Sequence, residues 1–455
     1  MAQITVKYDP TLEIEQIQEL MYATTKEEDE SNTEGEFAQT KITGIVTPLI
    51  KVNHINIMWS QITNFELSST DLLPKLSFTF IDDCGFVKSL EQPGNDNLVL
   101  VQILPAFEDA YKKINLRFYI DDVSIVRNKV TITAIYNVRS LYQYRIQAFG
   151  KMSTYDYLDK IAKECELGLA SNIDGTKDEH YIYMNNMNYI QSIKQEISYA
   201  GEQQCIPDCW VDFHNYLVVC DMYERYNAID KDLKVWTTGT VKPNVDATAT
   251  IEPKQVDAII SNAIAMRNTQ LFTNDYQVHS KSGNNKTYGT DRVLESYYMG
   301  NGESKSILIQ DGDVKKDTFV KTIYLGEVFG DYDYFLQEAC RNAYLRKIKS
   351  NYIEVALKQP VLGLERGQRV DFKWYEVNPL TQAVKDTKQV ESNVPNPEQD
   401  DEPADADQMQ INNQVSGQYL IIGTIIKYKG LEKGWEYILQ LARPTDKKEN
   451  YLDNE

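Results

Sequence analysis

Four residues between positions 205 and 220 have side chains of the types that bind zinc. Cys205, Cys209, His214 and Cys220 provide three thiols and one imidazole, which are common ligands of tetrahedral zinc sites. The intervening segments of three, four and five residues do not match a standard zinc knuckle. We also expect His214 at a hairpin tip and Cys220 in the strand that leaves it. We therefore interpret the cysteines as buried free thiols and predict no metal site.

Acidic residues elsewhere provide weaker candidates. Asp311-Gly312-Asp313 resembles part of a calcium loop, but the regular run of oxygen ligands and the closing glutamate are missing. The pairs Asp82-Asp83 and Asp121-Asp122 could act as acid and base only if their side chains converged. Adjacent residues of a strand point to opposite faces, so we place both pairs at strand ends.

Signatures of catalysis are absent from the sequence. It has no Gly-x-x-x-x-Gly-Lys-Ser/Thr phosphate loop, no His-Glu-x-x-His, no Cys-x-x-Cys and no Gly-x-Ser-x-Gly. Four histidines leave few general bases or metal ligands. We therefore predict that the chain is not an enzyme, and we assign no catalytic, cofactor-binding or metal-binding residue and no cofactor.

Composition excludes further classes of function. The chain has 455 residues, with 47 basic and 67 acidic side chains and a net charge of −20. Affinity for nucleic acid comes largely from basic side chains on phosphates, so we predict no specific nucleic-acid binding. The mean hydropathy is −0.46, no apolar run reaches the roughly 20 residues of a spanning helix, and positions 1–7 do not resemble a secretion signal. Thirty tyrosines indicate either a Tyr-rich β protein or a subunit with several large partner surfaces.

Alternation of apolar and polar residues predicts strands with one buried face. The pattern is clearest at residues 76–80, 116–120 and 130–134, and strands are also predicted at 419–428 and 435–441. Short strands at such spacing are typical of a sandwich or barrel.

Residues 153–221 interrupt this β pattern with helical spacing. Leu158, Ile161, Ala162 and Cys165 predict one apolar face of a helix over 153–166, which ends at Leu167-Gly168-Leu169. Ile190, Ile193, Ile197 and Ala200 predict a second helix, stopped by Gly201. Two strands around a two-residue His214-Asn215 loop predict a β-hairpin, and we expect the first helix to pack against it.

The second half of the chain returns to short strands. We predict strands at 233–238, 247–251, 258–266, 352–357 and 369–374, long loops or an arm at 268–315, and a helix at 331–347. Residues 381–414 include a run at 398–407 whose six acidic residues have no basic neighbour, a composition that cannot form a packed core. We interpret this segment as an excursion from a hairpin, whose strands at 369–374 and 419–428 are partners. A cation-binding or regulatory role is the alternative to a solvated loop.

The sequence therefore predicts a mainly β fold with a small α/β insert: two tube-like antiparallel β-barrels joined by an α/β module. The expected regions are an N-terminal arm with an acidic loop at 1–40, a first barrel at 41–150, the module at 151–228, a second barrel at 229–375, the acidic excursion at 376–414, and closing strands at 415–455.

The order of these elements resembles a known family. The resemblance rests on residues 152–162 and 167–169, the 210–219 hairpin, and the segments 360–370, 416–423 and 441–443. Together they are similar to the tail hub proteins of contractile-tailed phages, a family that includes late control protein D and the hub part of type VI secretion spike proteins. The match covers roughly residues 42–443 and depends on element order, not on an invariant motif. The length of the acidic excursion departs from the family pattern.

The resemblance implies a structural role. In such hubs three chains form a ring of six barrels, which joins the sixfold tail tube to the threefold central spike and leaves a channel for DNA during genome ejection. It implies a homotrimer whose partners are the tail tube protein, the spike protein and other baseplate proteins. The expected location is the tail baseplate of a virion, after synthesis in the host cytoplasm.

The sequence leaves two alternatives to a phage tail hub. One is the hub of a type VI-like or extracellular contractile injection device, which shares the fold. The other is a carbohydrate-binding or depolymerising tail protein, which should expose clustered tryptophans and paired carboxylates. The five tryptophans of this chain are scattered instead: Trp59, Trp210, Trp236, Trp374 and Trp435.

Overall fold

A computed structural model describes most of residues 47–227 and several segments of 351–443, together with a short N-terminal segment. The described residues are 4–15, 17, 47–53, 55–83, 85, 97–104, 111–176, 178–200, 206–227, 351–357, 360, 362–372, 416–431 and 433–443, together with the backbone of short strands between 250 and 325, at 375–377 and at 409–411, and residue 345. The predicted helix at 331–347, the tripeptide Asp311-Gly312-Asp313 and the acidic residues 398–407 lie outside this set apart from residue 345.

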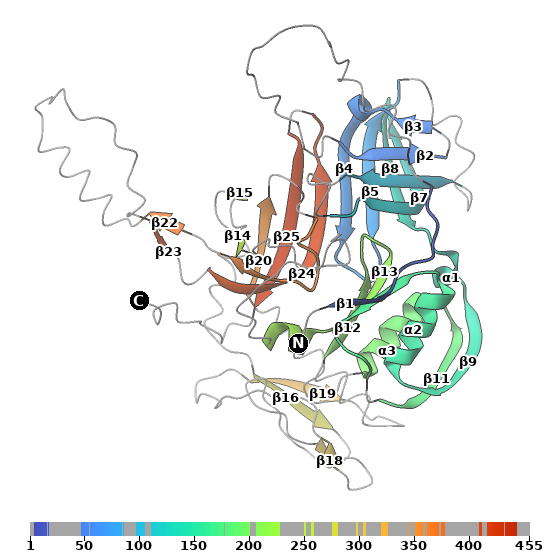
Figure 1. The fold of residues 1–455 in the computed structure, drawn as a ribbon, viewed down its shortest axis with the longest axis vertical. Helices are drawn as coiled ribbons and strands as arrows, with labels where there is room; N and C mark the ends of the chain where they lie inside the picture. The colour runs from blue at the N-terminus through green and yellow to red at the C-terminus, as the bar shows by residue number, and fades with distance from the viewer. Residues whose placement is uncertain are drawn as a thin grey trace, which may run out of the picture.

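One large sheet of thirteen strands dominates the described residues and curls into a half-barrel (Figure 1). Along its main path every neighbouring pair is antiparallel. The order is β15 (Val256–Ala258), β20 (Asn351–Leu357), β25 (Trp435–Arg443), β24 (Gly417–Tyr428), β4 (Ile62–Ser69), β5 (Lys75–Ile81), β8 (Lys129–Tyr136), β7 (Ile114–Val126), β6 (Leu98–Ile103), β2 (Leu49–Val52) and β3 (Ile55–Ile57). β21 (Arg369–Phe372) pairs with β24 and with β14 (Thr250–Ile251).

The alternating residues of the sequence form the core of this sheet. Phe65, Phe78 and Phe118 are fully buried on β4, β5 and β7, and Ile132 and Leu439 are buried on β8 and β25. The intervening positions are mostly polar, because the second face of the sheet meets water. The predicted strands at 76–80, 116–120 and 130–134 are therefore confirmed.

Strands from opposite ends of the sequence join in the middle of this sheet. β24 pairs with β4, with Lys427 opposite Glu66 and Ile426 opposite Leu67. The described strands of the two predicted barrel regions thus form one continuous curled sheet. The predicted fold class, mainly β with a small α/β insert, is confirmed.

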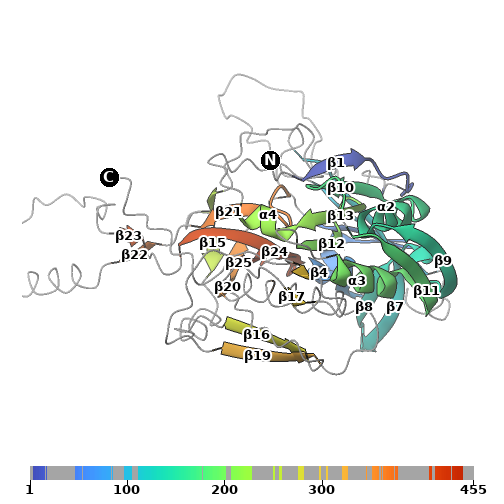
Figure 2. The same ribbon diagram turned by 90° about the horizontal axis from the view of Figure 1, so that it is seen from below.

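The α/β module has three layers beside the half-barrel. A four-stranded sheet contains β1 (Thr5–Tyr8), β10 (Gly168–Ser171), β13 (Tyr216–Asp221) and β12 (Pro207–Val211). The helices α2 (Thr154–Glu164) and α3 (Tyr189–Tyr199) lie between this sheet and a two-stranded ribbon of β9 (Arg145–Met152) and β11 (His180–Met187) (Figures 1 and 2). The short helices are α1 (Arg139–Tyr142), α4 (Met222–Asn227) and the 3₁₀ turn Trp59–Gln61.

Helix α2 begins as predicted and ends differently. The Ser153 side chain accepts a hydrogen bond from the Asp156 N–H and caps the first turn. Leu158, Ile161, Ala162 and Cys165 are all buried, which confirms the predicted apolar face.

The end of α2 is a Schellman motif in which Glu166, not Gly168, has the positive φ of 59°. The Leu167 N–H bonds the Ala162 carbonyl and the Glu166 N–H bonds the Lys163 carbonyl. Gly168 instead begins β10, where a Cβ would lie 2.4 Å from the Tyr216 ring. The prediction of a glycine stop was therefore wrong.

Helix α3 and the following hairpin show two further differences. α3 has an Asn188–Gln191 capping box, and Tyr189 is fully buried beside the predicted Ile193 and Ile197. The turn between β12 and β13 encloses three residues, 213–215, instead of two, because the Asp212 N–H bonds the Tyr216 carbonyl and closes the hairpin there. Asn215 takes the left-handed conformation that closes such a loop.

Several short pairs complete the described backbone. β16 (Asp275–Ser280) pairs with β19 (Val320–Leu325), and β17 (Tyr297–Tyr298) pairs with β18 (Ser304–Lys305). The segment 268–315, predicted as loops or an arm, therefore contains three strands. β21 pairs with β24 as predicted for 369–374 and 419–428, and β22 (Tyr375–Val377) pairs with β23 (Met409–Ile411). The predicted pairing of the strands on either side of the acidic segment is therefore confirmed, and β23 lies inside the predicted bounds of that segment.

Candidate functional site

The four zinc-type residues do not converge in the described structure. Cys209 and Cys220 are buried cysteines on the paired strands β12 and β13, and burial raises the pKa of the Cys220 thiol well above its ordinary value. His214 is buried in the hairpin loop, where its Nε2 lies 3.3 Å from Glu365 Oε1. Cys205 is outside the described residues. Within the described part of the chain no three His, Cys, Asp or Glu side chains form a group able to hold a metal ion.

The paired carboxylates also remain apart. Asp82-Asp83 follows β5, as predicted, where the Asp82 N–H bonds the Asn128 carbonyl. Asp121-Asp122 lies in the middle of β7 and not at a strand end, because β7 continues to Val126 in a long hairpin with β8. A register shift between Ile120 and Asp122 leaves both carboxylates exposed.

The described residues instead form a polar network around residues 362–368, which we call the junction loop. Arg366 connects three parts of the molecule through one guanidinium. Its Nη1 donates to the Asp71 carbonyl at 2.8 Å, and its Nη2 lies 3.1 Å from Asp208 Oδ2. The same group stacks over the Trp210 ring at 4.5 Å. The junction loop is thereby fixed to the loop between β4 and β5 and to strand β12.

Arg225 holds the other side of the junction loop. This side chain is buried at the end of the module, and its Nε donates to the Gly367 carbonyl at 2.8 Å. Gly367 has a φ of +86°, and a Cβ at this position would lie 3.0 Å from the Trp210 ring. A glycine is therefore required where the loop passes under Trp210.

Buried hydrogen bonds from two tyrosines link the junction loop and the hairpin to the half-barrel. Tyr437 of β25 donates its hydroxyl to the Leu364 carbonyl at 2.5 Å. Tyr136 at the end of β8 donates to Asn215 Oδ1 at 2.5 Å. Burial alone would lower the pKa of His214, but Glu365 outweighs that effect and raises it. His214 and Glu365 thus form a buried polar contact between the hairpin and the junction loop.

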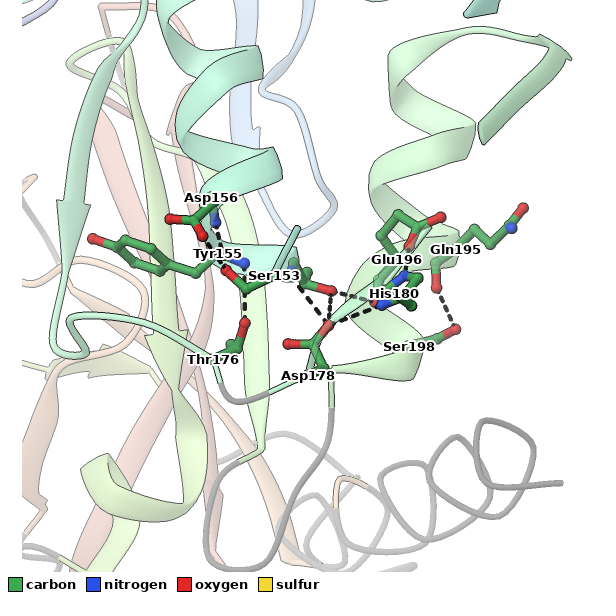
Figure 3. Close-up of polar contacts among 10 residues, drawn as sticks. Ser153, Tyr155, Asp156, Thr176, Asp178, His180, Gln195, Glu196 and Ser198 are labelled. Carbon is green, nitrogen blue, oxygen red and sulfur yellow. Dashed lines mark hydrogen bonds and ion pairs between the residues drawn. The ribbon is translucent and has the colours of Figure 1, made fainter. Parts of the chain in front are cut away.

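A second polar cluster lies within the module, around His180 at the start of β11 (Figure 3). His180 Nε2 lies 2.6 Å from Glu196 Oε2 of α3, and Nδ1 lies 3.4 Å from Asp178 Oδ2. Asp178 also accepts hydrogen bonds from the Thr154 N–H at 3.1 Å and the Thr154 hydroxyl at 2.6 Å. The cluster therefore ties the first turn of α2, the start of β11 and the last turns of α3 together.

The electrostatics of this cluster favour its charged form. Bonds to Asp178 and Glu196 raise the pKa of His180 to about 9, against the opposing effect of burial. Burial would raise the pKa of Asp178, but bonds from His180 and Thr154 outweigh it and lower the pKa. At neutral pH His180 is therefore a cation between carboxylates. A protonated, ion-paired imidazole suits a structural contact and is a poor general base.

Sequence reasoning did not identify either network. Arg366 bonds Asp71 and Asp208, which are 295 and 158 positions away in the sequence. His180 meets Glu196 only after the chain has turned through β11 and α3. One available signal was the rarity of histidine, since only four occur and two of them lie beside carboxylates.

Neither of the two tryptophan side chains that the structure describes is exposed. Trp210 and Trp435 are buried, so neither offers a face for stacking on sugar rings. The other three tryptophan side chains lie outside the described part.

None of the helices formed by the described residues is long and apolar enough to span a lipid bilayer.

Comparison with known proteins rests on structure. No protein-family model matches the chain, and none of the curated proteins matches its sequence. The 43 kDa tail protein of prophage MuSo2 from Shewanella oneidensis aligns over 88% of this chain and 98% of its own length, with a TM-score of 0.50 and 11% identity.

Two further solved structures align with lower TM-scores. A tail protein from Neisseria meningitidis MC58 aligns over 87% of this chain and 97% of its own, with a TM-score of 0.46 and 9% identity. A chain of the Francisella PdpA-VgrG complex aligns over 89% of this chain and 54% of its own, with a TM-score of 0.43 and 11% identity. By its alignment with the MuSo2 protein, this chain has the fold of a phage tail protein.

Proposed function

We propose that this chain is a structural hub protein of a contractile-tail baseplate. The observation that carries the proposal is the alignment with the MuSo2 tail protein, which covers nearly the whole of both chains. Because the identity is only 11%, the likeness concerns the fold, and the role is our inference from it.

In this proposal three copies form a ring around a central channel. The ring joins the sixfold tail tube to the threefold spike, and the tube protein, the spike protein and other baseplate proteins are its partners. The continuous sheet supports this arrangement, because β4 and β24 place two β regions side by side in one chain. Three such chains supply six regions, the number that a sixfold tube requires.

The junction loop supports a role that depends on rigidity. A subunit that closes a ring must hold its parts at fixed angles. Arg366, Arg225 and Tyr437 bond the junction loop to the β4–β5 loop, to the module and to β25. In this proposal the chain has no hydrolytic activity and binds no metal, and its contribution is geometric.

The mass of the purified chain in solution tests the proposal. We expect a species of three 52.4 kDa chains at micromolar concentration, measured by sedimentation or native mass spectrometry. A stable dimer or tetramer would contradict it. The mass measurement is then repeated with the spike protein added, because a trimer that needs its spike should form only in that mixture. A chain that stays monomeric with and without the spike protein would also contradict the hub.

A carbohydrate-binding tail protein is not favoured, because Trp210 and Trp435 are buried. Release of reducing sugar from a capsule or cell-wall substrate by the purified chain would reverse this preference. The genes beside this one would distinguish a phage tail from an injection device.

A further inference from the structure

Residues 4–15 and 17, which we call the N-terminal strap, cross from the α/β module to the half-barrel. The first part of the strap is β1, which pairs antiparallel with β10 at the edge of the module sheet, with Val6 opposite Ala170. In Figure 1 the dark blue strap leads from β1, beside the module, to the half-barrel near β7. β1 is therefore a strand added to a sheet edge, a common mode of peptide recognition.

Backbone and side-chain hydrogen bonds continue this contact beyond β1. The N–H groups of Thr11 and Leu12 donate to the Glu166 carbonyl, just past the end of α2, at 3.1 and 3.0 Å. The Tyr216 hydroxyl of β13 donates to the Asp9 carboxylate. The strap is thus bound to the module through its backbone as well as through its side chains.

The far end of the strap packs on the outer face of the half-barrel. Ile17 is buried in a small apolar cluster with Leu49 of β2 and Leu100 of β6. Asn115 Nδ2 of β7 donates to the Ile14 carbonyl at 3.4 Å. The two ends of the strap are therefore anchored on two different parts of the molecule.

A buried amide lies on the face that this end of the strap covers. Gln102 of β6 has no exposed surface, and neither its Nε2 nor its Oε1 has a hydrogen-bond partner among the described residues. It lies opposite Leu49 and two positions from Leu100, on the outer face where Ile17 docks. A buried amide without hydrogen bonds destabilises the state that buries it. This cost opposes the docking of the strap on the half-barrel.

The strap also buries little of itself between its two isoleucine ends. From residue 4 to residue 15 buried or partly buried positions alternate strictly with exposed ones, so only one side of the strap faces the protein. The pairing with β10 has a register shift between Val6 and Tyr8. Lys7 pairs with Asp174, whose side chain is 95% exposed, and exposed ion pairs contribute little to stability. Segments with few buried apolar contacts open before the rest of a domain unfolds.

We infer that the strap is a reversible ligand of the rest of the chain and that the surface beneath it binds an extended peptide. This surface, the strand acceptor, consists of the β10 edge, the Glu166 carbonyl and the outer face of β2 and β6 around Leu49 and Leu100. Its occupant is the strap of the same chain, which has an isoleucine at each end and one inward side. The strap leaves and rebinds while the module sheet stays folded. Binding takes place within one copy and does not require the proposed ring.

Hydrogen exchange of the purified full chain tests the release of the strap. We expect the amides of residues 5–12 to exchange roughly tenfold faster, or more, than those of β13, which lies inside the same sheet. The variant Val6→Cys/Ala170→Cys places two thiols opposite each other across β1 and β10. Its oxidised form should slow the exchange of residues 5–12, and its reduced form is the control. Equal exchange of the strap and β13 in the wild-type chain would overturn the inference.

A labelled peptide with the sequence of residues 1–17 tests the strand acceptor. Ile4→Ser/Ile17→Ser in the full chain weakens its own strap and leaves the acceptor unchanged. We expect this variant to bind the peptide roughly tenfold more tightly than the wild-type chain does, because the internal competitor is weakened. The oxidised disulfide variant and a peptide of scrambled sequence should show no binding.

Two results with the peptide would overturn the inference. One is a variant that stays folded and does not bind the peptide, and the other is a variant whose module unfolds when its strap is weakened. Both measurements are independent of the oligomeric state. A chain that binds the peptide but never forms a trimer would therefore contradict the proposed hub and leave the strand acceptor in place.

Discussion

His180 Nε2 lies 2.6 Å from Glu196 Oε2, and this contact joins the start of β11 to the last turns of α3. Both side chains are largely buried, with 12% and 5% of their surface exposed. Asp178 on the other side of the imidazole ties the same group to the first turn of α2 through Thr154. One protonated histidine thus holds three elements of the module together.

The stability of the module should therefore depend on pH between neutral and alkaline conditions. The pKa of His180 is raised to about 9 in the folded chain, above an unfolded value of about 6.5. A raised pKa stabilises the fold fully below the unfolded value, and the stabilisation is lost as the pH rises through 9. We expect the free energy of unfolding of the wild-type chain to fall from pH 6 to pH 9.5.

His180→Gln should remove this pH dependence. At pH 6 the variant should lose about 1.5–3 kcal/mol, the usual value of a hydrogen bond to a charged group, and at pH 9.5 the loss should be smaller. Denaturant unfolding of both chains at the two pH values measures the difference. A constant difference across this range would show that His180 does not bear a charge in the folded chain.

The apolar face of α2 is the second feature to test. Leu158 and Ile161 have no exposed surface, so Leu158→Ala or Ile161→Ala should cost about 2–5 kcal/mol. Lys163→Ala on the exposed face removes an i,i+4 pair with Asp159 and a cation–π contact with the Tyr8 ring, and should cost at most about 1 kcal/mol. Thermal unfolding of the three variants gives the comparison. Equal effects at Ile161 and Lys163 would mean that α2 does not pack on the module sheet.

Much of the fold could be predicted from residue spacing alone. Leu76, Phe78 and Phe80 alternate because one face of β5 is buried, and Leu158 and Ile161 share a face because α2 packs on one side. The partnership of β21 and β24 also followed from the strand pattern on both sides of the acidic segment.

The contacts between elements could not be predicted in this way. Arg366 and Glu196 resemble ordinary surface charges in the sequence, since their partners are distant or follow a turn of the chain. The end of helix α2 was predicted at the wrong residue, because Glu166 adopts the left-handed conformation that glycine usually provides. Periodicity reports which side of an element is buried, but it does not report which other element covers that side.

The third prediction concerns the junction loop. Arg366→Met keeps the apolar stem over Trp210 but removes the donors to Asp71 and Asp208. We expect a loss of about 1.5–3 kcal/mol in stability, because charge-assisted bonds are broken and an acceptor is left without its partner. Lys433→Met, in the exposed β24–β25 turn, is the control and should change stability by less than about 0.5 kcal/mol. Retained stability in Arg366→Met would show that the junction loop is held by its apolar contacts alone.

The acidic excursion is the fourth feature to test. Residues 385–407 lie between the paired strands β22 and β23, and lengthening a surface loop costs only about 0.6 kcal/mol per doubling. Replacing them with a short Gly/Ser turn should leave the melting temperature nearly unchanged and keep the chain soluble. A longer deletion that also removes β23 is the comparison variant. We expect its melting temperature to be lower than that of the shorter deletion. Aggregation of the shorter deletion, with a soluble parent, would show that the segment supports the fold.

The symmetry of the assembled particle tests the proposed function most directly. Electron microscopy of the purified chain, alone or with its spike protein, should show a ring with threefold symmetry, six β regions around its rim and an open centre. Particles of any other rotational symmetry, or compact trimers without a central opening, would contradict the hub.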